Sequence, residues 1–191
     1  MARPSDARSR LIHAASALFR QRGYDGVGLT EILDKSGAPK GSFYHHFPEG
    51  KEQLAQACIH HAGEQINMLI DAAMNVAPDF ATGICEFAGG IASWFERSGF
   101  REGCPITSVV LARVPQSPQL TEAARTVIDG WQQRLLGHAT RFGTEASPAD
   151  AELLLVLVEG AWILGRIRQS KEPLLRTAEV FLALRQNGHV R

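Results

Sequence analysis

Apolar residues recur at helical spacing along nearly the whole chain, and this periodicity is the strongest constraint on its fold. Between residues 51 and 75, for example, apolar side chains return every three or four positions from Ile59 through Ala62 and Ile66 to Leu69. No segment shows a convincing alternation of apolar and polar residues, which is the pattern of a half-buried strand. The sequence therefore predicts an all-α protein of about nine helices.

Capping residues indicate where several of these helices begin. Ser117–Pro118 and Ser147–Pro148 each place a good N-cap residue before a proline that suits the first helical position. The helix after Ser147 is predicted to run to about Gln169, and a last helix is predicted over residues 172–187. We expect a three-helix DNA-binding domain over residues 1–50 and a larger helical bundle over residues 51–191.

Bulk composition excludes several classes of protein without selecting one. The formal net charge is zero, although residues 1–53 carry eight Lys or Arg and six Asp or Glu, a net charge of +2. The three cysteines form no CxxC pair, so a disulfide framework is not expected. The longest apolar run, residues 153–158, is far too short to span a bilayer, and no signal peptide is recognisable. We expect a cytoplasmic protein with no membrane partner.

Residues 29–51, LTEILDKSGAPKGSFYHHFPEGK, have the spacing of a helix-turn-helix. Two short helices are predicted with about four residues between them, and Gly37 suits the end of the first. Thr30 can cap the first helix, and Pro39 suits the first position of the second. By this pattern alone, a plain helical hairpin with an aromatic core is about as probable as a DNA-binding unit.

The second helix of this motif, predicted from Pro39 to Phe47, has two distinct sides. Phe43 and Phe47 lie four residues apart and are predicted to face inward. Lys40 falls in the first turn, where a cation opposes the helix dipole unless an anion lies opposite. The outward side carries small or hydrogen-bonding residues that suit phosphate or base contact: Gly41, Ser42, Tyr44, His45 and His46.

These residues resemble the signature of the TetR family of bacterial regulators. The sequence KGSFYHHF is followed by Lys51, Glu52 and Leu54, as in that family, and residues 18–32 fit its first helix and the link to the second. The resemblance covers about the first 55 residues. The FPEGK turn, which has one residue more than most members, and residues 103–112, GCPITSVVLA, resemble the LmrA/YxaF-like subgroup.

The resemblance implies a homodimer whose two recognition helices enter successive major grooves of a palindromic DNA operator. Repression is the usual mode of this family. Its DNA-contacting positions correspond here to Thr30, Lys40, Gly41, Ser42, Tyr44, His45 and Lys51. Pro39 stands where many relatives have Ser or Thr, which removes one potential phosphate donor.

The resemblance also places the dimer interface on the last two helices and a pocket for a small-molecule effector in the C-terminal bundle. The expected pocket residues are Phe87, Ile91, Trp94, Phe95, Cys104, Val110, Trp131 and Trp162, with Met68 and His138 as further candidates. Because this set is apolar and aromatic, we expect a hydrophobic or aromatic effector. Each of these residues, taken singly, is more often an ordinary core residue than a pocket residue.

An enzyme and a helical interaction module are the two functional classes that compete with a regulator. Cys58 and His61 lie three residues apart, with His60 adjacent, but no third ligand or acid partner stands at a suitable spacing. We therefore expect no metal site, no cofactor and no enzymatic activity. Cys104 as a thiol sensor is a minor hypothesis, because no resolving cysteine is close. A helical interaction module remains the third class, and it predicts no salt-dependent DNA binding.

Overall fold

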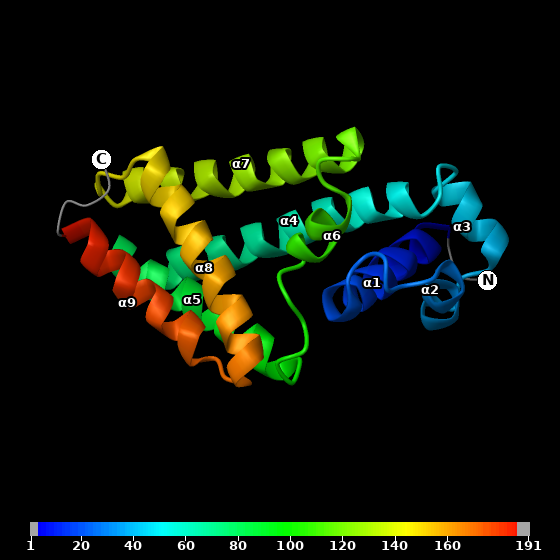
Figure 1. Cartoon of the computed structure of the whole chain (residues 1–191). Helices are drawn as coiled ribbons and strands as arrows, with labels where there is room; N and C mark the ends of the chain where they lie inside the picture. The colour runs from blue at the N-terminus through cyan, green and yellow to red at the C-terminus, as the bar shows by residue number, and fades with distance from the viewer. Residues whose placement is uncertain (1–3, 187–191) are drawn as a thin grey trace. The chain divides into compact units, whose positions relative to one another are not determined.

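The computed structural model describes residues 4–186, and within that range the chain forms nine α-helices and no strand (Figure 1). This confirms the predicted all-α fold. In chain order the helices are α1 (Pro4–Arg22), α2 (Leu29–Ser36), α3 (Lys40–His46), α4 (Lys51–Val76), α5 (Phe80–Arg97), α6 (Thr107–Arg113), α7 (Pro118–Arg141), α8 (Pro148–Arg168) and α9 (Glu172–Gln186). Residue 187, where the last helix was predicted to end, lies outside the described residues.

Side-chain caps explain where several helices begin. At α8, the Ser147 side chain accepts a hydrogen bond from the Asp150 backbone N–H, and the Asp150 carboxylate accepts one from the Ser147 N–H at 2.7 Å. This reciprocal capping box, followed by a proline, confirms the predicted start. At α7, Ser117 Oγ accepts from the Leu120 N–H at 3.2 Å, which confirms the second predicted cap.

The chain divides into two compact units by its internal contacts. The first comprises the chain up to Glu64 together with Cys104–Val127, and the second comprises Gln65–Gly103 and the chain from Ile128 onward. The division falls inside α4 and inside α7, so each of these helices contributes residues to both units. The boundary predicted after residue 50 separates two functions rather than two compact units, and it stays a prediction.

In the first unit, α1 packs against α2, α3 and α6. Its core contains large apolar side chains that are almost completely buried: Phe19, Ile32, Phe43, Phe47 and Leu54. Burying each of these side chains contributes roughly 1.5–3 kcal/mol to folding relative to leaving it exposed. The short helices α2 and α3 are therefore held by tertiary packing, since isolated helices of this length are marginal in water.

In the second unit, α9 packs against both α5 and α8, and Figure 1 shows α8 and α9 side by side. Phe87, Phe95 and Phe181 are buried in its core. Gly165 permits close packing, because a Cβ at that position would lie 2.9 Å from the Phe95 ring. Among residues 4–186, no helix has the length and apolar character that crossing a membrane requires.

Candidate nucleic-acid interface

The turn between α2 and α3 is built by a glycine and a buried serine. Gly37 caps the C-terminus of α2 in the left-handed conformation, with φ 61° and ψ 21°, which explains the glycine at that position. Ser36 Oγ donates to the Leu33 carbonyl at 3.0 Å and accepts from the Ala38 N–H at 3.2 Å. The turn is thus stabilised on both sides, and the predicted helix-turn-helix is present.

Two details of the predicted caps are wrong. Thr30 does not cap α2, because the helix begins at Leu29 and its N-cap is Gly28, whose extended backbone accepts from the Ile32 N–H at 3.3 Å. Pro39 is the N-cap of α3 rather than its first residue, because its ψ of 145° is extended while its carbonyl accepts from the Phe43 N–H. Thr30 consequently lies in the first turn of α2 with its side chain exposed.

The recognition helix α3 has one buried and one open side. Phe43 and Phe47 are 0% and 1% exposed, as predicted, and their rings lie 5.8 Å apart. On the other side Lys40, Tyr44 and His45 are exposed, Tyr44 by 47%. Gly41 is also exposed, and a Cβ placed there would meet nothing within 4 Å. The fold itself therefore does not require glycine at residue 41.

Lys51 differs from the other predicted DNA-contacting residues because its side chain is engaged within the protein. Its Nζ donates to the Tyr24 carbonyl at 2.7 Å and lies 4.0 Å from the centre of the Tyr24 ring. Burial lowers the pKa of Lys51, the nearby Asp25 carboxylate opposes that change, and Arg113 adds to it. The structure thus groups Lys51 with Tyr24, and its contact with a phosphate stays a prediction.

Sequence reasoning missed several charged residues of the first unit. The exposed Arg8 places its guanidinium 5.7 Å from the Phe47 ring centre, close to the end of α3. Arg113 lies 5.4 Å from the Tyr24 ring centre and forms an ion pair of 3.5 Å with Glu52. The FPEGK motif indicated Lys51. No local pattern indicated Tyr24 and Arg113, which lie 27 and 62 residues away from Lys51 in the sequence.

Of the predicted effector-pocket residues, the structure brings three together in the second unit. The Trp162 ring centre lies 6.4 Å from that of Trp94 and 6.3 Å from that of Phe95, both in edge-on geometry. Phe100, which was not predicted, lies 5.3 Å from Phe95. The Trp162 Nε1–H donates to the Glu102 carbonyl at 2.9 Å, so its polar atom is satisfied.

The other predicted pocket residues differ in burial and in the unit to which they belong. Phe87, Ile91 and Trp131 are each 3% exposed or less. Cys104 and Val110 belong to the first unit rather than the second. The two further candidates also differ from each other: Met68 is 62% exposed, and His138 is engaged by a carboxylate. None of these placements tests a role in effector binding.

His138 belongs to a charged network within the second unit. Its Nε2 lies 2.8 Å from Asp71 Oδ1, and Arg134 also hydrogen-bonds the Asp71 carboxylate. Partial burial raises the pKa of Asp71, but the hydrogen bonds from His138 and Arg134 outweigh it and leave this pKa below its ordinary value. The network therefore joins α4, through Asp71, to α7, through Arg134 and His138.

Cys58, the candidate nucleophile or metal ligand, is a buried thiol. Cys58 is 3% exposed and its Sγ lies 3.7 Å from the Ile12 carbonyl oxygen, while burial raises the pKa of its thiol to about 12. Such a thiol is a poor nucleophile at neutral pH. The His61 ring centre lies 4.9 Å from that of His13 of α1, with the two rings tilted by 52°. No group of three or more potential metal ligands occurs within the part of the chain that the structure describes.

Large apolar side chains are exposed along α8 and α9 in the second unit. Ile167 is 73% exposed, Val156 62% and Ile163 58%. A groove of about 300 Å³ runs along this face between Val156, Gly160 and Leu164 of α8 and Thr177 and Val180 of α9. We refer to this surface, Val156, Gly160, Ile163, Leu164, Ile167 and Val180, as the α8–α9 face.

Comparison with known proteins agrees with this architecture. Residues 11–58 match the family model for bacterial regulatory proteins of the tetR family, and residues 81–180 match the model for the C-terminal domain of LmrA/YxaF-like transcriptional regulators. The chain is 32% identical over 178 residues to the uncharacterized HTH-type transcriptional regulator YxaF of Bacillus subtilis, covering 91% of this chain and 92% of that protein. Its identity to the HTH-type transcriptional regulator LmrA of Bacillus subtilis is 33% over 172 residues, with 89% and 92% covered.

Solved structures are similar over almost the whole chain. A regulatory protein TetR from Rhodobacter sphaeroides has a TM-score of 0.81 at 27% identity, covering 92% of this chain and 96% of that one. A cysteine mutant of the regulator CifR, complexed with 26-bp operator DNA, has a TM-score of 0.76 at 20% identity, with 96% of each chain covered, which is a likeness of fold alone. These matches confirm both resemblances, that of KGSFYHHF to the family and that of FPEGK and GCPITSVVLA to one branch of it. The chain belongs to the TetR family of bacterial transcriptional regulators, in its LmrA/YxaF-like branch, and is a regulator that binds DNA.

Proposed function

We propose that this regulator is a repressor that binds a palindromic operator as a homodimer and is released by a small hydrophobic or aromatic effector. The observation that carries the proposal is the open side of α3. It presents exposed polar side chains around Gly41, at which a Cβ would have open space. Because Gly41 has no side chain, its backbone can approach a nucleic acid closely, and packing within the protein does not explain the glycine.

The proposed DNA contacts divide by chemistry. Lys40 and Thr30 are exposed and suit phosphate oxygens, which set position and affinity. Tyr44 and His45 carry hydrogen-bonding tips on the open side of α3 and suit base edges. The full proposed set is Thr30, Lys40, Gly41, Ser42, Tyr44, His45 and Lys51, with Lys51 the least accessible of the cations.

The proposed partner for the α8–α9 face is a second copy of this chain. Several large apolar side chains are exposed together there, which is costly for a monomer in water. A two-fold interface would bury the same face on both copies. A palindromic operator requires the two α3 helices of such a dimer to reach half-sites about 34–36 Å apart.

The proposed effector site includes Trp94, Phe95 and Trp162, in which the Trp162 ring lies against each of the other two. An aromatic or apolar molecule suits such a lining better than a sugar or a phosphate does. Effector binding is proposed to shift α4, which contributes Lys51 to the first unit and Asp71 to the second. A regulator of chromosomal DNA acts in the cytoplasm, and this proposal needs no cofactor.

The deciding experiment is selection of bound fragments from genomic DNA with the full chain, followed by titration of the recovered DNA at several salt concentrations. We expect a palindrome, and an affinity that falls steeply as salt rises. An affinity independent of salt would instead favour a helical interaction module. Quenching of tryptophan fluorescence by a panel of aromatic compounds and sugars then tests the effector class, and a response to sugars alone would contradict it.

A further inference from the structure

Tyr24, which follows α1, is held by two other segments of the first unit. It is 6% exposed. Its backbone N–H donates to the Ser108 carbonyl of α6 at 3.1 Å, and its own carbonyl accepts from Lys51 Nζ of α4 at 2.7 Å. Both backbone polar groups of this link are therefore satisfied by residues outside α1 and α2.

The Tyr24 side chain is held by the same two segments. Its ring centre lies 4.0 Å from the Lys51 ammonium and 5.4 Å from the Arg113 guanidinium. Two cations near one aromatic ring repel each other, and Glu52 supplies the compensating charge. The Glu52 carboxylate forms an ion pair with Arg113 at 3.5 Å and accepts a hydrogen bond from Ser117 Oγ. We call Tyr24, Lys51, Glu52, Arg113 and Ser117 the Tyr24 cluster.

The Tyr24 cluster also connects to the core beneath the recognition helix. The Tyr24 ring lies 5.4 Å from that of Phe19, which is 1% exposed. Phe19 belongs to α1, the helix that packs against both α2 and α3. A displacement of residues 108–113 would therefore shift the positions of Tyr24 and Phe19, since close-packed interiors transmit strain.

We infer that Arg113 is a positioning residue through which residues 104–117 set the operator-binding geometry of α2 and α3. The inference rests on the proposed function and adds its regulation. Residues 104–117 share a compact unit with α1, α2 and α3, although they stand far from them in sequence. Arg113 is the one residue of this segment whose side chain engages both Tyr24 and Glu52 in the described contacts.

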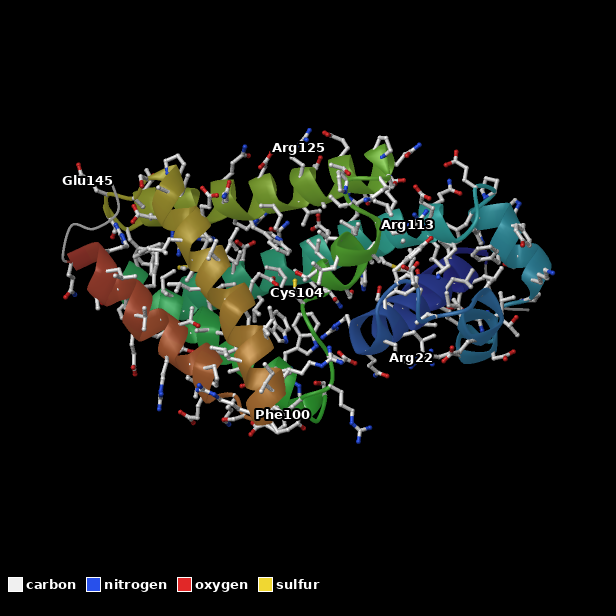
Figure 2. All side chains as sticks on the ribbon, in the orientation of Figure 1. Arg22, Phe100, Cys104, Arg113, Arg125 and Glu145 are labelled. Atoms are coloured by element: carbon white, nitrogen blue, oxygen red, sulfur yellow. The ribbon has the colours of Figure 1, made fainter. Side chains whose placement is uncertain are left out.

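Coupling between two sites is reciprocal, and this supplies the test. If residues 104–117 position α3, operator binding must in turn slow the hydrogen exchange of backbone amides in residues 104–117. We therefore compare the full chain with Arg113→Met, which removes the charge and keeps most of the aliphatic stem. The matched control is Arg125→Met, since Arg125 forms an exposed i,i+3 pair with Glu122 in the same unit. Arg113 and Arg125 are both labelled in Figure 2.

In the wild-type chain and in Arg125→Met, operator DNA is expected to protect both residues 40–47 and residues 104–117. In Arg113→Met, protection at residues 104–117 is lost, and operator affinity falls about fivefold or more. Arg113→Lys keeps the positive charge and is expected to recover part of both effects. A merely structural role would lower stability without uncoupling the two segments, and thermal unfolding of each variant measures that separately.

The outcomes separate this inference from the proposed function. If the wild-type chain binds no DNA in a salt-dependent way, the proposed function fails. If it binds DNA but Arg113→Met behaves like Arg125→Met in both affinity and exchange, the inference about Arg113 is overturned. Absence of operator-induced protection at residues 104–117 in the wild-type chain would overturn it as well.

Discussion

The open side of α3 and the α8–α9 face are two uncovered surfaces with opposite chemistry. On α3 the aromatic residues Phe43 and Phe47 are buried, and polar or small residues are exposed. The α8–α9 face instead exposes large apolar residues, with Ile167 73% exposed and Val156 62%. A polar surface with cations suits a hydrated anionic partner, whereas an apolar surface is stabilised only by a partner that excludes water. The two surfaces therefore suit different kinds of partner.

The largest expected effect separates the two sides of α3. Phe43→Ala should lower the free energy of unfolding by about 3–5 kcal/mol, because it leaves a cavity in the core of the first unit. Tyr44→Ala, one residue later on the open side, should change it by no more than about 0.5 kcal/mol. Urea unfolding at a fixed protomer concentration measures both. Equal losses would mean that α3 has no open side in solution.

The next largest effect concerns the α8–α9 face. Val156→Glu should convert the proposed homodimer to monomers, because dimerisation would bury an unpaired charge, and operator affinity should fall about a hundredfold or more. Sedimentation equilibrium measures the oligomeric state. Val76→Glu is the matched control, since Val76 of α4 is 76% exposed and belongs to the same unit. Identical masses for Val156→Glu and the wild-type chain would show that this face is not the dimer interface.

A smaller effect tests the anionic partner of α3. Lys40→Met should weaken operator binding about tenfold for all DNA sequences and reduce the slope of log affinity against log salt by about one. Titrations at four salt concentrations measure the slope. Lys171→Met removes the same charge from the second unit, where Lys171 pairs with Glu96 at 2.8 Å, and should leave the slope unchanged. An unaltered slope in Lys40→Met would remove Lys40 from the DNA contacts.

The smallest expected effect concerns the pH dependence of stability, to which His61 of the first unit and Asp71 of the second contribute over different pH ranges. Burial, and secondly the charge of His13, lower the pKa of His61 below its ordinary value of 6.5. The unfolded chain therefore binds this proton more readily, and the stability that neutral His61 provides is present above pH 6.5 and is lost as the pH falls through the folded-state pKa.

Asp71 in the second unit loses its contribution only at more acidic pH, because its pKa lies below 3.8. His61→Gln should thus flatten the dependence of stability on pH between about 7 and 5. His60→Gln, the exposed neighbour on α4, should leave that dependence as it is. Unfolding midpoints measured across this range decide, and equal slopes for His61→Gln and the wild-type chain would contradict the assignment.

Local patterns predicted the local features correctly. Helical periodicity, the caps at Ser117 and Ser147 and the buried pair Phe43 and Phe47 all depend on residues within a few positions of one another. The two wrong caps, Thr30 and Pro39, are errors of one or two residues at helix ends. Such ends are decided by backbone dihedral angles, which several sequences adopt equally well.

By itself, the sequence determined the all-α class, the position of the recognition helix and the family, because these follow from short-range spacing and a specific motif. The tertiary structure alone decided that residues 104–127 belong with the recognition helix, and that Lys51 lies against Tyr24 with Arg113 and Glu52 beside it. It also decided that Trp94, Phe95 and Trp162 meet. These contacts join residues 27 to 89 positions apart. Their physical reason is the packing of whole helices, which no local pattern of residues encodes.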